Sequence, residues 1–222
     1  MILMPKTKTR VNSDRKIRLA IVGVGNCASA LIQGLAYYRR NQDDTTGLMH
    51  PELGGYRVTD IEPVVAFDVA ANKVGRDLSE AIFAPPNMAY RLPDGEVPLS
   101  GATVQMGPVH DGMPSHLADL VTITDRDPVD VVAALKASGV EVMLNCLPTG
   151  SAQAARVYAR AALEAGVAFV NGMPELIVCD PAFAQEADAR GVPLIGDDIK
   201  SQLGGTILHR ALIETMLARG IR

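Results

Sequence analysis

The sequence predicts an α/β protein built on a doubly wound parallel sheet. Three features support this fold class. A glycine-rich turn lies between an apolar run and a helical pattern, strand and helix patterns alternate regularly after Asp127, and the 222 residues are 48% hydrophobic and 21% charged. Parallel strands joined by helices require right-handed crossovers, so we expect helices on both faces of the sheet.

The first half of the chain carries the expected elements with two interruptions. The apolar run Ile17–Val22 predicts a buried strand, and the period then changes to helical spacing from Cys27 to Tyr38. A polar, turn-rich insertion is expected from Asn41 to Asp60. A strand, a helical pattern, a proline-rich excursion and a short strand follow, over 64–67, 74–82, 85–101 and 102–105.

The second half alternates without interruption. Helices are expected over 128–137, 151–165, 181–189 and 204–218, with strands over 141–146, 167–170 and 192–195. Asp127 and Asp180 precede Pro128 and Pro181, which predicts an N-cap and first-turn proline at two helix starts. We expect a basic flexible tail over residues 1–16 and one α/β domain over 17–222, with the insertion at 41–60.

Composition and charge exclude several classes of protein. The cysteines Cys27, Cys146 and Cys179 have neither disulfide nor zinc-site spacing, which is typical of a reducing compartment. The formal charge is −4 although the first sixteen residues are basic, so the body of the chain is acidic and disfavours nucleic acid. The four histidines share no short spacing, so no metal site is expected.

The uncharged stretch Leu19–Tyr38 has the length of a membrane span. Its four glycines, its polar residues and its change of period favour a strand followed by a helix instead. The apolar run at the N-terminus is too short for a secretory signal. We therefore expect a cytoplasmic protein that does not bind membranes.

The turn Gly23-Val24-Gly25-Asn26-Cys27-Ala28 matches the G-x-G-x-x-G/A fingerprint of dinucleotide-binding proteins. The first glycine permits a tight turn, the second lets a pyrophosphate approach the backbone, and Ala28 allows close packing of helix on strand. The N-terminus of the helix offers N–H groups and a positive dipole. A tight turn without a nucleotide is the alternative, but the strand–turn–helix context favours cofactor binding by Gly23, Gly25, Asn26 and Cys27.

Asp68 ends the second strand of the predicted sheet. A carboxylate there accepts hydrogen bonds from the adenosine ribose and repels a 2′-phosphate, which favours NAD over NADP. Asp68 lies 43 residues beyond Gly25 rather than about 20, and the insertion accounts for the difference. The alternative is that Asp68 caps a helix. Lys73 and Asp77 follow, either near the same ribose or as surface ion-pair partners.

Ligands of doubly wound sheets lie beyond the carboxyl ends of the strands. Residues 147–151, which include Pro148, are expected to border the nicotinamide ribose. Residues 196–202 follow the last strand with two carboxylates, Asp197 and Asp198, then Lys200 and Ser201. Lys200 is the one lysine of six expected on this side, so it is the candidate proton donor or oxyanion stabiliser, with Asp197 beside it. Its alternative role is to pair with a neighbouring aspartate.

Four segments resemble the bacterial branch of the myo-inositol-1-phosphate synthase family, also called inositol-3-phosphate synthase. They are Ala20–Gly34, Asp43–His50, Ala66–Phe83 and, most specifically, Gly196–Arg210. The resemblance implies an isomerase that converts glucose 6-phosphate to inositol 1-phosphate by oxidation, enolisation, aldol cyclisation and re-reduction on a tightly held NAD. It also implies that Lys200 lies beside the reacting sugar and that the cofactor contacts include Asp68, Asp77, Tyr158, Asp198 and Ser201.

The family's pattern extends beyond Arg222 into a second, sheet-rich domain. In that family this domain supplies most active-site lysines, binds the substrate phosphate and builds a tetramer, and some members use a cation. We therefore expect this chain to be an amino-terminal, nucleotide-binding portion that belongs to a homo-oligomer and is inactive by itself. Two other functions stay open: a non-catalytic NAD-binding module, and an NAD oxidoreductase that acts on a small amino or hydroxy acid.

Overall fold

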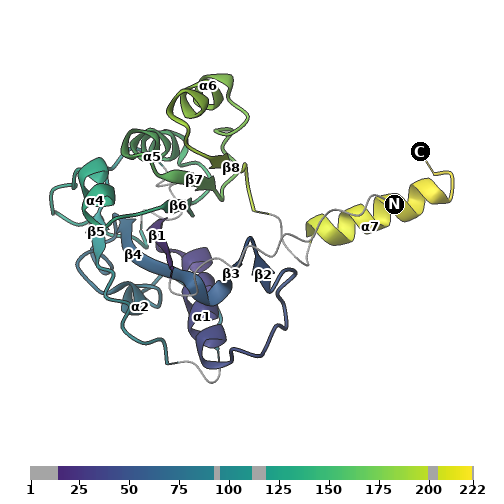
Figure 1. Ribbon diagram of the computed structural model, residues 1–222, viewed down its shortest axis with the longest axis horizontal. Helices are drawn as coiled ribbons and strands as arrows, with labels where there is room; N and C mark the ends of the chain where they lie inside the picture. The colour runs from purple at the N-terminus through teal and green to yellow at the C-terminus, as the bar shows by residue number, and fades with distance from the viewer. Residues whose placement is uncertain (1–14, 93–95, 112–118, 200–204, 222) are drawn as a thin grey trace.

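The computed structural model describes residues 15–92, 96–111, 119–199 and 205–221. Within these residues a six-stranded sheet is flanked by helices, and a two-stranded hairpin lies apart from it (Figure 1). The predicted tail falls almost wholly outside the described residues, so the division of the chain into tail and domain stays a prediction.

The main sheet is parallel throughout. Its strands lie in the order β5-β4-β1-β6-β7-β8. Counted along this sheet alone, the order is 3-2-1-4-5-6, the arrangement typical of dinucleotide-binding folds. The predicted doubly wound parallel sheet is therefore confirmed. The strand bounds are β1 Ile17–Val22, β4 Ile61–Asp68, β5 Val104–Met106, β6 Val142–Asn145, β7 Ala168–Asn171 and β8 Leu194–Ile195.

Two hydrophobic cores lie on opposite faces of the sheet. Strand β1 contributes to both because its side chains alternate: Ala20 and Val22 belong to one core, and Leu19 and Ile21 to the other. The first core includes residues of α4, α5 and α6, and the second includes residues of α1 and α2. These helices span Asn26–Arg40 (α1), Leu78–Ala81 (α2), Val131–Ala137 (α4), Ala152–Ala165 (α5) and Pro181–Arg190 (α6).

Two predicted helix starts have different outcomes. Helix α6 begins at Pro181 with Asp180 as its N-cap, as predicted, and the Asp180 carboxylate accepts from the Ala182 N–H. The predicted start of α4 at Pro128 is wrong. The N-cap is Asp130, whose carboxylate accepts from the Ala133 N–H at 3.0 Å. The helix begins after Asp130 because this residue has an extended backbone conformation, with φ −68° and ψ 105°. The preceding Val129 N–H donates to the Met106 carbonyl, which ties this segment to β5.

The connection between α1 and β4 holds the small hairpin. Strands β2 (Glu52–Leu53) and β3 (Tyr56–Arg57) pair antiparallel, and a short 3-10 helix spans Val58–Asp60. The helical pattern predicted over 74–82 yields only the single turn of α2. The residues before it form turns, and the Gly75 N–H attaches them to β5 by donating to the Val104 carbonyl at 2.8 Å.

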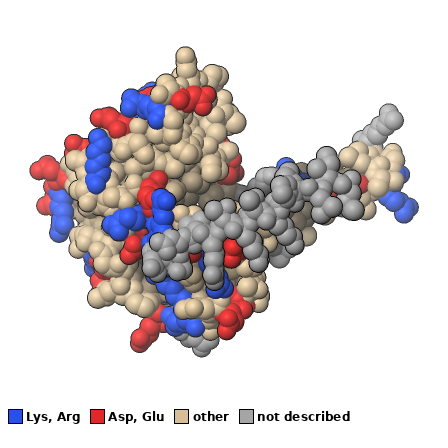
Figure 2. All heavy atoms as spheres, viewed as in Figure 1, with Lys and Arg blue, Asp and Glu red and all other residues tan. Residues whose placement is uncertain are grey.

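Helix α7 (Gly205–Ala218) extends away from the sheet (Figure 1). Five of its large apolar side chains are between 39% and 61% exposed: Ile207, Leu208, Leu212, Ile213 and Leu217. In the described part of the chain, no helix combines the length and apolar character needed to cross a membrane. Figure 2 shows basic and acidic side chains interspersed over the visible face of the body.

Candidate functional site

The glycine turn connects β1 to α1 at the carboxyl edge of the sheet. Gly23 has a φ of +83°, and a Cβ built on it would lie 2.8 Å from the Cys146 carbonyl oxygen at the end of β6. Its N–H donates to the Phe67 carbonyl at 2.9 Å. A side chain at position 23 would therefore meet both backbone strain and a backbone clash, so the turn requires glycine here.

Gly25 has a different role because it borders open space. It is the N-cap of α1, and a Cβ there would have no described atom within 4 Å. Among the described residues no side chain caps this helix, and its first turn contains no acidic residue. The helix N-terminus is therefore open and electropositive. This cradle fits the pyrophosphate of a dinucleotide, which would occupy the space that a side chain at position 25 would fill.

Asn26 and Cys27, the other predicted contacts in the turn, are both exposed. The Asn26 side-chain oxygen accepts from the Met88 N–H at 2.7 Å, so Asn26 also ties the turn to the loop after α2. Cys146 lies close to Cys27, and burial together with this neighbour raises the pKa of the Cys146 thiol to about 12. Cys146 is therefore a neutral thiol at physiological pH.

Asp68 lies where the sequence places it, at the end of β4 and against the glycine turn. Its Oδ2 accepts from the Val24 N–H at 2.8 Å, and its Oδ1 accepts from the N–H groups of Val69 and Ala70. No described helix begins at Asp68, so the alternative role of helix cap is wrong. Three N–H groups leave acceptor capacity on the carboxylate for a ribose hydroxyl.

Asp77 caps α2 rather than forming a surface ion pair. Its carboxylate accepts from the backbone and hydroxyl of Ser79, the backbone and hydroxyl of Ser100, and the Gly101 N–H. Burial alone would raise the pKa of Asp77, but these hydrogen bonds outweigh it and the pKa lies below its ordinary value. Both carboxylate oxygens of Asp77 therefore already bind protein donors. A contact between Asp77 and the cofactor stays a prediction.

Tyr158 on α5 is 2% exposed and packs against Phe67, with ring centroids 5.8 Å apart. A Cβ on Gly107 would lie 1.9 Å from the Tyr158 hydroxyl oxygen, so glycine at 107 makes room for this hydroxyl. Burial and the nearby Asp68 carboxylate raise the pKa of Tyr158. The Tyr158 hydroxyl therefore stays protonated at physiological pH. Its predicted contact with the cofactor is untested.

A buried polar chain links the carboxyl ends of β6, β7 and the loop after β8. The Asn145 amide donates to the Asn171 side-chain oxygen at 2.9 Å, and the Asn171 amide donates to Asp197 Oδ1 at 2.8 Å. Both asparagines are almost fully buried. Sequence reasoning assigned neither asparagine a role in the site, although each ends a strand of the sheet, and that position is the signal that could have identified them.

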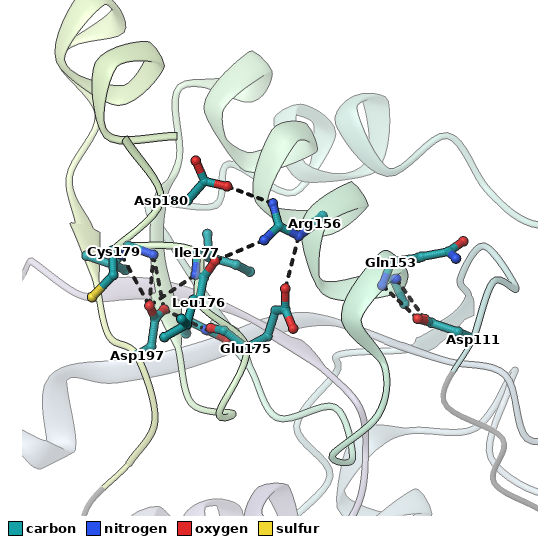
Figure 3. A network of polar contacts seen from close by, with 12 residues as sticks. Asp111, Gln153, Arg156, Glu175, Leu176, Ile177, Cys179, Asp180 and Asp197 are labelled. Carbon is teal, nitrogen blue, oxygen red and sulfur yellow. Dashed lines mark hydrogen bonds and ion pairs between the residues drawn. The ribbon is translucent and has the colours of Figure 1, made fainter. Parts of the chain in front are cut away.

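Asp197 is the centre of this network (Figure 3). Besides Asn171, its carboxylate accepts from the N–H groups of Ile177, Val178 and Cys179, at 3.0 to 3.2 Å. Burial would raise its pKa, but the hydrogen bonds from Asn171 and the three N–H groups lower it below the ordinary value. This geometry makes Asp197 an anchor between two loops, and its predicted catalytic role is untested.

The loop after β7 is also held from the other side by α5 (Figure 3). Arg156 donates to Glu175 at 3.0 Å, to Asp180 at 2.9 Å and to the Leu176 carbonyl at 3.1 Å. Since Arg156 and Asp197 hold the same loop, its backbone is fixed at the edge where ligands of this fold bind. At the start of α5, Asp111 accepts from the N–H groups of Gln153 and Ala154.

The remaining predicted residues lie at the same edge or outside the described residues. Pro148 is exposed in the loop after β6. Asp198 is exposed, has a φ of 73° and accepts from the Ile199 N–H through its own carboxylate. Lys200 and Ser201 lie outside the described residues. Within the described ranges no cluster of three or more His, Cys, Asp or Glu residues suits a metal ion.

Comparison with known proteins adds independent findings. An NAD-binding family model described as Myo-inositol-1-phosphate synthase matches residues 137–220, from the end of α4 through α7. The match therefore covers the part of the chain that carries Asp197 and does not include the glycine turn.

Curated relatives match over almost the whole chain. The inositol-3-phosphate synthase of Mycolicibacterium smegmatis is 50% identical over 208 residues, which cover 93% of this chain and 57% of that protein. The inositol-3-phosphate synthase of Mycobacterium tuberculosis strain CDC 1551 is 50% identical over 213 residues, which cover 95% of this chain and 57% of that protein. This chain therefore spans a little over half the length of these relatives.

A solved structure matches the fold over the same range. The crystal structure of Ari2 superposes with a TM-score of 0.80 at 43% sequence identity, covering 93% of this chain and 61% of that chain. The arrangement of strands and helices described above is thus shared with an experimentally determined structure.

Proposed function

We propose that this chain, which is similar over almost its whole length to inositol-3-phosphate synthases, binds NAD and forms the nucleotide-binding part of an enzyme of that kind. The enzyme would convert glucose 6-phosphate to inositol 1-phosphate. The observation that carries the proposal is the arrangement at the glycine turn, where an open helix N-terminus at Gly25 lies beside the carboxylate of Asp68.

The geometry of the glycine turn suits two parts of NAD, the pyrophosphate and the adenosine ribose. The N-terminus of α1 and the Gly25 N–H would bind the pyrophosphate, and Asp68 would accept hydrogen bonds from the adenosine ribose. A 2′-phosphate placed beside Asp68 would be repelled by the carboxylate, which favours NAD over NADP. This preference follows from the position of Asp68 next to the turn rather than from its residue type alone.

When bound, NAD would supply a hydride acceptor and donor, so that the sugar is oxidised and later reduced with no net redox change. The chain's own residues would orient the nicotinamide half at the ends of β6 and β8. The Asn145–Asn171–Asp197 chain and Arg156 hold the loops there in place. Lys200, which follows these loops in sequence, would stabilise negative charge on a substrate oxygen or donate a proton to it.

Two measurements test the proposal. Calorimetric titration of this chain is expected to give saturable NAD binding and much weaker NADP binding. A version extended to the length of its relatives is expected to form inositol phosphate from glucose 6-phosphate with catalytic NAD, detected by phosphorus NMR. Accumulation of NADH would instead indicate an ordinary oxidoreductase, and NAD binding without turnover in the extended protein would indicate a binding module.

A further inference from the structure

A buried lysine lies directly behind the glycine turn. Lys73 is 5% exposed, although sequence reasoning placed it on the surface or at the ribose. Its Nζ donates to the Val24 carbonyl at 2.8 Å and to Asn87 Oδ1 at 3.1 Å, and lies 3.9 Å from Asp68 Oδ2. Burial lowers the pKa of Lys73, and the Asp68 carboxylate opposes this effect.

Both backbone polar groups of Val24, its N–H and its carbonyl, are hydrogen-bonded on the inner side of the glycine turn. Its N–H donates to Asp68, and its carbonyl accepts from Lys73 and, at 2.9 Å, from the Asn87 amide. Asn87 belongs to the loop after α2, which is also attached to the turn by the contact between Asn26 and the Met88 N–H. Two separate segments therefore converge on the one residue between the two glycines.

This contact decides which way the next peptide points. In a trans peptide the carbonyl and the N–H point in opposite directions. Because the Val24 carbonyl is bound inside by Lys73 and Asn87, the Gly25 N–H of the same peptide points outward. The space beside Gly25 is open, because a Cβ there would have no described atom within 4 Å.

Gly25 on one side makes this peptide easier to rotate, because glycine accepts backbone conformations closed to other residues. If the peptide rotated, its carbonyl oxygen would face the anion cradle and repel a phosphate. An ammonium and an amide on the inner side oppose that rotation, and the charge of Lys73 adds positive potential behind the cradle. The Asp68 carboxylate compensates the positive charge of the Lys73 ammonium, because a buried charge needs an oppositely charged partner.

We propose that Lys73, assisted by Asn87, is a positioning residue for the dinucleotide turn: it holds the Val24–Gly25 peptide with its N–H directed at the pyrophosphate. The proposal rests on the proposed function, since it needs a dinucleotide at this turn. In this proposal Lys73 and Asn87 serve the recognition of the phosphates, and Asp68 serves the recognition of the ribose. Asp68 is held by three backbone N–H groups of its own, so its position does not depend on Lys73 alone.

The test compares ligands with and without phosphates. Affinities for NAD, ADP-ribose and adenosine are measured by calorimetry, or by competition for the weaker ligands, on the 222-residue chain. Lys73→Met is expected to weaken NAD and ADP-ribose by roughly tenfold or more, the scale of one charge-assisted hydrogen bond, and adenosine by less than twofold. Lys136→Met, which removes an exposed lysine of α4, is the matched control and is expected to change none of them.

Asn87→Ala provides a second variant in case Lys73→Met does not fold. Circular dichroism reports whether each variant is folded. It removes the other donor to the Val24 carbonyl and is expected to show the same pattern at a smaller amplitude. Unchanged NAD affinity in the folded variants, or an equal loss for adenosine and NAD, would overturn the positioning role. If the wild-type chain does not bind NAD at all, the proposed function itself is wrong, and this inference with it.

Discussion

Asp68, Asp77 and Asp197 each lie at or near the end of a regular element, yet the structure uses their carboxylates differently. Asp77 binds five donors and closes the start of α2. Asp197 binds backbone N–H groups of a loop and the Asn171 amide. Asp68 binds the glycine turn and retains acceptor capacity. The environment of each carboxylate, rather than its residue type, therefore distinguishes the structural Asp77 and Asp197 from Asp68, the candidate for ligand binding.

Asp68→Ala is expected to weaken NAD binding roughly tenfold to a hundredfold, because one charge-assisted hydrogen bond contributes about 1.5 to 3 kcal/mol. The preference for NAD over NADP should fall at the same time, since the repulsion of the 2′-phosphate is lost. Calorimetric titration with both nucleotides measures the two effects. Asp188→Ala, at an exposed position of α6, is the matched control. Unchanged NAD affinity in Asp68→Ala would rule out the ribose contact.

Asp197→Asn is expected to lower the free energy of unfolding at pH 7 by about 2 kcal/mol, since four donors lose a charged acceptor. The pKa of Asp197 is lowered in the folded protein, so its contribution is present above the unfolded value near 4 and is lost as pH falls through the folded value. Urea unfolding of both proteins should therefore show a difference at pH 7 that shrinks below about pH 4. A difference that is independent of pH would contradict this account.

At the scale of elements, the strand–turn–helix unit separates the tasks of its two glycines. Gly23 is required by the fold, because the turn bends there under the end of β6. Gly25 is not required by the fold, which leaves the space next to it open, and in the proposed function it is the ligand that requires glycine there. The fingerprint alone does not distinguish these two requirements.

Gly23→Ala and Gly25→Ala are therefore expected to differ in what they impair. Gly23→Ala should destabilise the fold by more than about 2 kcal/mol, through left-handed backbone strain and the contact with Cys146. Gly25→Ala should cost less than about 1 kcal/mol of stability. It should nevertheless weaken NAD binding roughly tenfold, because its methyl group occupies the phosphate space.

Thermal unfolding and NAD titration of the two glycine variants check this separation. Similar stability losses in both variants would contradict the different roles assigned to the glycines. Undiminished NAD binding by Gly25→Ala would show that the pyrophosphate does not approach the backbone there.

For the whole molecule, α7 is the feature that sets its behaviour in solution. The exposed apolar side chains of this helix recur at helical spacing, as Leu208 and Leu212 do. Contiguous exposed apolar surface drives association. We expect the 222-residue chain to self-associate in a concentration-dependent manner.

Replacing Leu208 and Leu212 by Gln is expected to reduce this self-association and to leave the unfolding temperature of the sheet unchanged. Glu214→Gln changes an exposed polar residue of the same helix and is the matched control. Sedimentation velocity over a range of concentrations measures the effect. A wild-type chain that stays monomeric at about 100 µM would show that the exposed face of α7 does not associate.

The sequence by itself determined the order of strands and helices, the glycine turn and the position of Asp68 at a strand end. These features are local: a period of 2 or 3.6 and the spacing within a fingerprint report the geometry of neighbouring residues. The resemblance to inositol-3-phosphate synthases could also be read from contiguous segments. For the same reason the start of α4 was misplaced, since the segment before it is tied to a distant strand through the contact between Val129 and Met106.

Only the tertiary structure decided the order of strands across the sheet, the burial of Lys73 and the polar chain through Asn145, Asn171 and Asp197. Each of these depends on pairs that are far apart in sequence: Lys73 and Val24 are separated by 49 residues, and Asn145 and Asn171 by 26. No periodicity or short spacing encodes such pairs. They form because the strands bring their carboxyl ends to one edge, where buried polar groups must find partners in whatever segment lies opposite.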